Sequence, residues 1–136
     1  MAVLGACGGS SVEGVQIDEV WARPTPAGAA VAAVYFEIEA GAADRMVAAR
    51  VDPAIAAGAE LHATTVDDTS GEVEMRQLDG VPVEPGSALS FEPGGNHVML
   101  VDVVRPLVAG TTFALTLDLE RAGPQVVTVS VRDGPP

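Results

Sequence analysis

Residues 92–104 read EPGGNHVMLVDVV, a Pro-Gly-Gly turn followed by a run of β-branched and other apolar residues. Such a run after such a turn predicts a β-strand over 97–104. Because side chains two positions apart on a strand point to the same side, His97 and Met99 are expected to share one face. One imidazole and one thioether would then face the same space, which is half of a site for a soft metal ion.

The other half of such a site can be sought in the remaining histidine and methionines. The second of the two histidines, His62, follows the short apolar run at 59–61. Met75 lies on a segment that a β-hairpin would bring beside His62, because polar turn residues at 67–71 separate two extended runs. The register of that hairpin is left open, and a shift by one residue would turn Met75 to the opposite face. The candidate ligands, with 12, 21 and 1 residues between successive members, are His62, Met75, His97 and Met99.

The rest of the chain also consists of short extended runs separated by turns rich in Gly, Pro and Asp. No segment of useful length has the helical period, and turns recur about every 8 to 12 residues. This pattern indicates an all-β domain, an antiparallel sandwich or barrel of about nine short strands. The expected strands are 12–21, 29–40, 45–51, 60–65, 72–77, 87–91, 97–104, 111–119 and 125–131.

Length and composition limit both the fold and the classes of partner. The 136 residues, 48% of them hydrophobic, suffice for one domain with one core and no disulfide. All seven basic residues are Arg, and the formal net charge is -12. A nucleic acid would be repelled over most of such a surface, and adsorption to an anionic membrane through a basic patch is excluded. Nothing in the sequence signals an oligomer, so a monomer is expected.

The N-terminal region carries the chain's one cysteine, Cys7, in the stretch LGACGGSS. This stretch resembles the lipobox of bacterial lipoproteins, whose Cys becomes the acylated first residue of the mature chain. A signal peptide contains an apolar stretch of about 7 to 15 residues, but only three residues precede Leu4. The alternative to a lipobox is therefore an ordinary N-terminus that happens to carry a Cys. A lipid on Cys7 would be the one expected contact with a membrane. The predicted organisation is a lipobox-like tether at 1–14, a β domain at 15–132 and a tail at 133–136.

The chemistry of the candidate ligands favours Cu(I). Imidazole and thioether donors without thiolate or carboxylate specify a soft monovalent ion, whereas Zn(II) would prefer Cys or carboxylate beside His. A blue-copper centre normally uses a Cys thiolate, and no Cys lies near these residues. Taken singly, each His or Met has an ordinary structural explanation. What favours a site is their concentration within 62–99, and Met46, outside this range, is assigned to the core.

Several stretches of the chain closely resemble the periplasmic copper chaperone family PCu(A)C, and the likeness covers roughly residues 15–132. The resemblance implies a cupredoxin-like β-sandwich that binds Cu(I) through two His and two Met and delivers copper to the CuA centre of cytochrome c oxidase. Carried over, the ligands are His62, Met75, His97 and Met99. The stretches are WARPTP (21–26), AVYF (33–36), ADRMV (43–47), ELH (60–62), EMR (74–76) and PGGNHVML (93–100).

Two departures from the family pattern concern the first ligand and the spacing after it. The family often has Met directly after its first His, where this chain has Ala63. The interval between His62 and Met75 is also one residue longer than usual. The extra residue is expected in the turn at 67–71, where it would leave the hairpin register intact.

The expected function is therefore that of an extracytoplasmic Cu(I)-binding metallochaperone, in the periplasm or on the outer face of the cell membrane. Its partner would be the copper-site subunit of cytochrome c oxidase or another copper protein. No general base, nucleophile or paired carboxylate stands out, so no enzyme activity is expected. Two alternatives stay open: a copper buffer or uptake protein with another client, and a metal-free β-sandwich that binds proteins.

Overall fold

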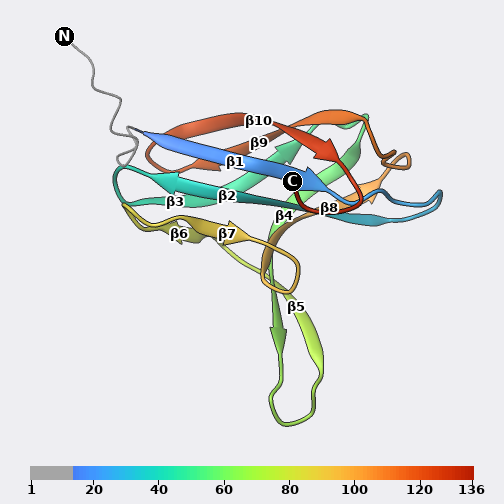
Figure 1. Cartoon of the computed structure of the whole chain (residues 1–136), viewed down its shortest axis with the longest axis horizontal. Coiled ribbons are helices and arrows are strands. Elements are labelled where there is room, and N and C mark those ends of the chain that lie inside the picture. The colour runs from blue at the N-terminus through green and yellow to red at the C-terminus, as the bar shows by residue number, and fades with distance from the viewer. Residues whose placement is uncertain (1–13) are drawn as a thin grey trace.

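The structure is a computed structural model that describes residues 14–136, apart from the side chain of residue 66. The lipobox-like Cys7 lies outside the described residues. Within them the regular structure is all β, as expected (Figure 1). The strands are β1 (Val15–Ala22), β2 (Val31–Ala40), β3 (Asp44–Val51), β4 (Ala56–Val66), β5 (Val73–Gln77), β6 (Val81–Val83), β7 (Leu89–Phe91), β8 (Asn96–Val103), β9 (Thr112–Leu119) and β10 (Gly123–Val131).

The strands form one sheet that closes on itself. Its order is β5-β4-β8-β2-β1-β10-β9-β3-β6, and an additional pairing of β4 with β3 completes a ring. β5, β6 and β7 are additions to this ring, because β5 pairs with β4, β6 with β3 and β7 with β2. The pairings are antiparallel except that of β1 with β10, which is parallel. The predicted sandwich or barrel is thus a closed barrel with extra strands.

Two segments differ from the sequence-based expectation. Pro82 and Pro85 predict an irregular stretch over 78–86, yet this stretch contains β6. Pro82 is tolerated there because β6 lies at the end of the strand order, where an N–H is not needed on the outer side. Pro53 and Gly58 predict a loop or at most one helical turn over 53–58, but only the first residues of this stretch turn and β4 begins at Ala56.

The core fills the inside of the barrel, and one strand separates it from the candidate site. On β8, Val98 and Leu100 are fully buried in the core cluster. His97 and Met99 alternate with them and point to the other side, yet they are also buried, with 3% and 7% of their surface exposed. Met99 and Trp21 are buried hydrophobic residues outside the core cluster. A second, smaller buried region therefore lies on the outer face of the barrel.

Candidate metal centre

The pairing of β4 with β8 brings the two histidines together. His62 lies directly opposite His97 in the antiparallel register, and Glu60 lies opposite Met99. Directly opposed residues of an antiparallel pair point to the same face. The imidazole centroids of His62 and His97 are 5.7 Å apart. Residues 35 positions apart in the sequence thus become cross-strand neighbours on one outer face.

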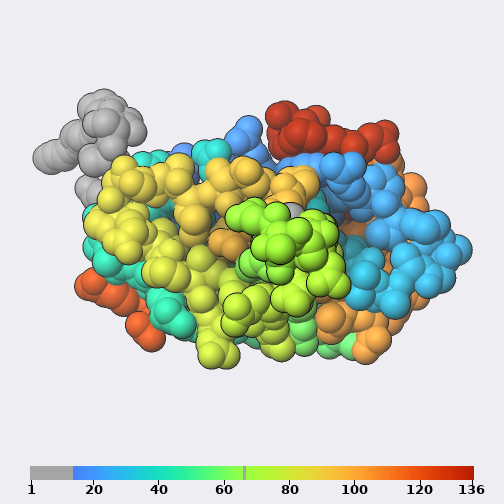
Figure 2. Space-filling view, turned by 90° about the horizontal axis from the view of Figure 1, so that it is seen from below, coloured from blue at the N-terminus to red at the C-terminus, as the bar shows by residue number. Residues whose placement is uncertain are grey.

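The hairpin of β4 and β5 carries Met75 on this same face. Thr64 pairs with Met75 and His62 pairs with Gln77, so Met75 lies diagonally across from His62. The observed register is shifted by two residues from a direct His62–Met75 pairing. Because side chains alternate with a period of two, this shift keeps Met75 on the same face of the sheet as His62. Figure 1 shows the hairpin extending away from the barrel, and Figure 2, seen from below, shows it (yellow-green) end-on in front of the barrel.

The turn of this hairpin contains the position where an extra residue was expected. The Asp67 carboxylate accepts hydrogen bonds from the backbone N–H groups of Thr69 (2.8 Å) and Ser70 (3.2 Å). Gly71 has a positive φ of 76° and donates its N–H to the Asp67 carbonyl at 2.7 Å. The turn is thus closed by its own residues, which leaves the pairing on either side regular.

His97 is held through one ring nitrogen and leaves the other without a partner. Its Nδ1–H donates to the carbonyl of Gly95 at 3.3 Å, in the turn that precedes β8. Its Nε2 is buried and has no hydrogen-bond partner within the described part of the chain. A buried polar atom left unsatisfied costs about 1 to 3 kcal/mol, so such an atom needs an explanation. A lone pair kept for a metal ion is one.

His62 shows the same arrangement with the ring nitrogens exchanged. Its Nε2–H donates to Oε1 of Glu60 at 2.9 Å. Its Nδ1 is the other buried side-chain atom without a partner among the described residues. Two imidazole lone pairs are therefore buried on one face, and both fit the donor set of a soft metal ion together with the thioether of Met99.

The four candidate ligands differ in their exposure to solvent. His97 and Met99 are buried, and the His62 side chain is 16% exposed. Met75 is 58% exposed, and every residue of β5 is exposed. The sheet thus presents three enclosed donors, and the hairpin adds a fourth from the solvent side. The assignment of all four as ligands stays a prediction.

Aromatic side chains cover the face beside the histidines. Tyr35 lies edge-on to His97 with centroids 6.4 Å apart, and Trp21 lies 5.1 Å from Tyr35. The guanidinium of Arg23 sits over the Trp21 ring at 5.5 Å, a cation–π contact. This row of side chains shields His97 from water on the β2 side.

Burial sets the protonation of the groups in this row. Burial lowers the pKa of His97, the hydrogen bond to Gly95 opposes this, and the nearby His62 lowers it further. The His97 ring is therefore neutral, the form that binds a metal, to a lower pH than a free histidine. Burial likewise raises the pKa of the Tyr35 hydroxyl, against the influence of Arg23, so this phenol stays protonated.

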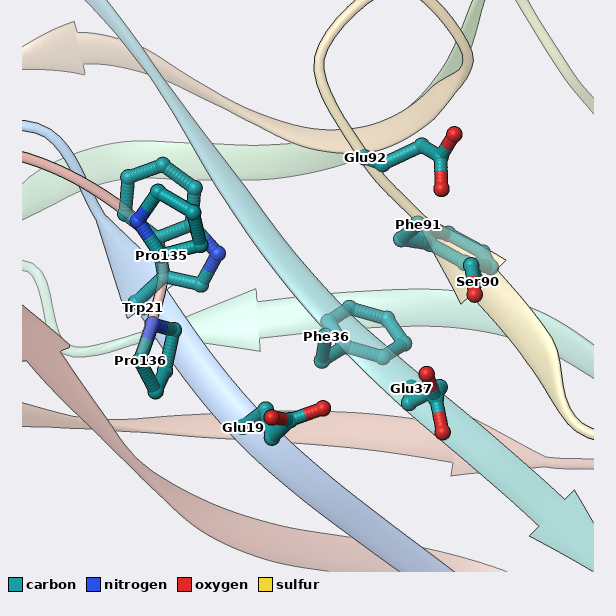
Figure 3. Close-up of a pocket in the computed structure, with 9 residues that line it drawn as sticks. All are labelled: Glu19, Trp21, Phe36, Glu37, Ser90, Phe91, Glu92, Pro135 and Pro136. Atoms are coloured by element: carbon teal, nitrogen blue, oxygen red, sulfur yellow. The ribbon is translucent and has the colours of Figure 1, made fainter.

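A separate pocket of about 160 Å³ has Trp21 in its lining (Figure 3). Phe36 and Phe91, stacked with centroids 4.3 Å apart, form part of its lining, and the C-terminal Pro135 and Pro136 approach it. The carboxylates at its edge belong to Glu19, Glu37 and Glu92. The candidate ligands do not line this pocket. Within residues 14–136, no group of three or more His, Cys, Asp or Glu side chains is arranged to hold a metal ion.

Sequence reasoning missed three residues that shape the site. Glu60 is the hydrogen-bond partner of His62, Gly95 orients His97, and Tyr35 covers it. The position of Glu60 two residues before His62 on a strand was a usable signal, because such residues share a face. The roles of Gly95 and Tyr35 depend on the turn and on the β2–β8 pairing, which carry no local signal.

Comparisons with known proteins agree with this fold. The chain aligns with a copper-bound PCuAC domain from PmoF2 (24% identity, TM-score 0.72, covering 91% of this chain and 97% of that one). It also aligns with the solution structure of CuI-DR1885 from Deinococcus radiodurans (23% identity, TM-score 0.62, covering 92% and 79%). The fold implied by the PCu(A)C resemblance is thereby confirmed.

Sequence comparisons match the chain to a family and a relative that are described as putative lipoproteins. It is 27% identical over 125 residues to "Putative lipoprotein Lxx21020" of Leifsonia xyli subsp. xyli, covering 92% of this chain and 74% of that protein. The part of the chain that the structure describes contains no helix long and apolar enough to cross a membrane. The model of the family described as "Putative lipoprotein LpqE-like" matches residues 15–131, and the chain belongs to this family.

Proposed function

We propose that this protein is an extracytoplasmic metallochaperone that binds one Cu(I) through His62, Met75, His97 and Met99. The observation that carries the proposal is the pair of buried, unpartnered imidazole nitrogens on the face that also holds Met99. Two structural neighbours, a copper-bound PCuAC domain and CuI-DR1885, support copper as the ion. The protein would act as a carrier and not as an enzyme.

The exposure of the ligands suggests how copper is passed on. His62, His97 and Met99 would hold the ion from the sheet, while Met75 reaches it from the hairpin. Because Met75 is the exposed donor, a ligand of the receiving protein would replace it first, and the remaining ligands would follow by stepwise exchange. Thioethers suit this exchange because they bind Cu(I) without a proton to lose.

The proposed client is the CuA centre of cytochrome c oxidase, as the PCu(A)C resemblance implies. The proposed location, outside the cytoplasm with a lipid on Cys7, is supported by the lipoprotein names of the family and of the relative. In this arrangement residues 1–14 would tether the domain, and residues 15–132 would carry the copper.

The test is an anaerobic Cu(I) titration of the soluble domain against a competing chelator. Three Met→Leu variants keep side-chain volume while removing a thioether: Met75→Leu, Met99→Leu and, as the matched control, Met46→Leu in the core. We expect one Cu(I) per chain, weaker binding in both site variants and unchanged binding in the control. Wild-type affinity in Met99→Leu and in a His97→Ala variant would show that the site is wrong.

Delivery needs a separate measurement. The copper-loaded protein is mixed anaerobically with the copper-free soluble domain of the oxidase subunit that forms the CuA centre. Samples taken over time are oxidised with ferricyanide, because two Cu(I) ions give a colourless site and loss of one electron per dicopper site produces the visible absorption of the mixed-valence CuA centre. Formation of that spectrum faster than from the Cu(I)–chelator complex alone supports the proposed client. Retention of copper by a protein that binds it tightly would instead indicate a buffer or a different client.

A further inference from the structure

The two histidines are anchored through opposite ring nitrogens, and each anchor comes from a different kind of group. A backbone carbonyl, that of Gly95, accepts the Nδ1–H of His97. A side-chain carboxylate, that of Glu60, accepts the Nε2–H of His62. Each hydrogen bond decides which nitrogen keeps its lone pair, because a neutral imidazole has one protonated and one unprotonated nitrogen.

We propose that Glu60 is a positioning residue of the copper site, which holds His62 in the tautomer that binds Cu(I) through Nδ1, while His97 binds through Nε2. This inference rests on the proposed function. The two nitrogens it names are the two buried side-chain atoms without partners in the described residues. Both lone pairs are thus set before copper arrives.

The position of Glu60 on the sheet explains why it can serve both His62 and the ion. It is two residues before His62 on β4, and it lies directly opposite Met99 on β8. Its carboxylate therefore sits on the face that carries the ligands, with its side chain 37% exposed. Glu60 engages His62 and is not proposed as a ligand itself.

Glu60 also supplies charge that the ligands lack. Two imidazoles and two thioethers are neutral, so bound Cu(I) would leave a net positive charge on a partly buried face. A carboxylate hydrogen-bonded to a ligating His raises the basicity of that ring and offsets the charge of the ion. Such outer partners typically contribute about 10- to 100-fold to metal affinity.

The tautomers can be measured without copper. Long-range ¹H–¹⁵N spectra of the apo protein at neutral pH distinguish protonated from unprotonated ring nitrogens. We expect His62 to be protonated at Nε2 and His97 at Nδ1, and we expect Cu(I) to shift the ¹⁵N resonances of His62 Nδ1 and His97 Nε2. Two histidines in the same tautomer, or a copper-dependent shift that is larger at His62 Nε2 than at His62 Nδ1, would overturn the proposal.

Three variants separate positioning from charge and from general effects on the fold. Glu60→Ala removes the acceptor and the charge, and we expect it to weaken Cu(I) binding about 10- to 100-fold and to move the His62 Nε2 resonance. Glu60→Gln keeps an acceptor oxygen, so we expect it to restore part of the Cu(I) affinity and to bring the His62 Nε2 resonance part of the way back. Glu39→Gln, on the same outer face of β2 but beyond the aromatic row, is the charge-matched control and should match the wild type.

The outcomes for this inference and for the proposed function are distinct. If the wild type takes up no Cu(I), the proposed function fails, and the apo tautomers still report whether Glu60 orients His62. If the wild type binds Cu(I) with both thioethers but Glu60→Ala binds equally well, only the role of Glu60 is refuted.

Discussion

His97 is a buried histidine whose protonation is coupled to folding. Its pKa lies below the ordinary 6.5 because burial disfavours the charged ring, and the unfolded chain therefore takes up this proton more readily than the folded chain. The stability that the neutral ring contributes is present above pH 6.5 and is lost as the pH falls through that value toward the folded pKa.

We therefore predict that the free energy of unfolding of the apo protein decreases between about pH 7.5 and 5.5, above the range where most carboxylates titrate. Urea unfolding at several pH values measures this decrease. A His97→Gln variant provides the comparison, because it cannot take up the proton and should show a flatter profile over the same interval. Parallel profiles for the two proteins would contradict the prediction.

At the scale of residues, the sequence predicted which side chains share a face of the sheet. It predicted less well which groups those side chains contact. The period of two places His97 beside Met99, and the register bears out this alternation on β8. The partners of the ring nitrogens were not predictable in the same way. Gly95 acts through its carbonyl, which any residue could offer. The spacing of Glu60 and His62 shows that they share a face, but it does not show that this carboxylate, one of 19 acidic residues, meets the ring.

At the scale of elements, β8 presents two buried faces with different tasks. Leu100 is fully buried in the barrel core, whereas Met99 lies on the outer face. We predict that Leu100→Ala lowers the free energy of unfolding by about 2 to 5 kcal/mol but leaves Cu(I) affinity near the wild-type value at temperatures where the protein is folded. Met99→Leu should weaken Cu(I) binding and leave the free energy of unfolding near the wild-type value. Denaturant unfolding and the chelator titration, run on both variants, check this separation; a loss of both properties in either variant would refute it.

The β4–β5 hairpin is the element that positions Met75. Asp67 closes its turn through two backbone N–H groups, and the hairpin has few other constraints because β5 is exposed along its length. We predict that Asp67→Ala speeds the dissociation of Cu(I) while the unfolding midpoint of the apo protein changes little. Stopped-flow transfer to a chelator measures the rate. Asp68→Ala, which keeps both turn bonds, is the control and should release copper at the wild-type rate.

The strands themselves were largely predictable, and the exceptions have physical causes. β6 was missed because Pro82 argues against a strand except at an edge, and the sequence alone does not show that this segment pairs only with β3. The alternation on β1 breaks at Glu19, whose φ of 54° accompanies a register shift between Asp18 and Trp21. Such an irregularity depends on the neighbouring strand and leaves no local pattern.

At the scale of the whole molecule, ring closure supports the site. β4 pairs with β8 over seven aligned residues from Ala56 to Ala63, and with β3 through Ala49 and Ala59. The His62 strand is therefore attached to the barrel on both sides before it continues into the hairpin. This arrangement fixes the histidine pair on the barrel, whereas Met75 lies on the exposed strand of the hairpin.

Since the candidate ligands come from β4, β5 and β8, copper would join three strands that only the folded chain brings together. A ligand that binds the folded state alone stabilises it by RT ln(1 + [L]/Kd), about 4 kcal/mol at a free concentration 1,000 times the Kd. We predict that buffered Cu(I) raises the Tm of the wild type by roughly 10 °C or more. Thermal unfolding under anaerobic conditions measures the shift, with Met99→Leu at the same free Cu(I) as the comparison. Because the variant keeps His62, His97 and Met75, we expect a smaller copper-dependent rise in its Tm. Equal rises in the two proteins would mean that copper binds somewhere other than this face.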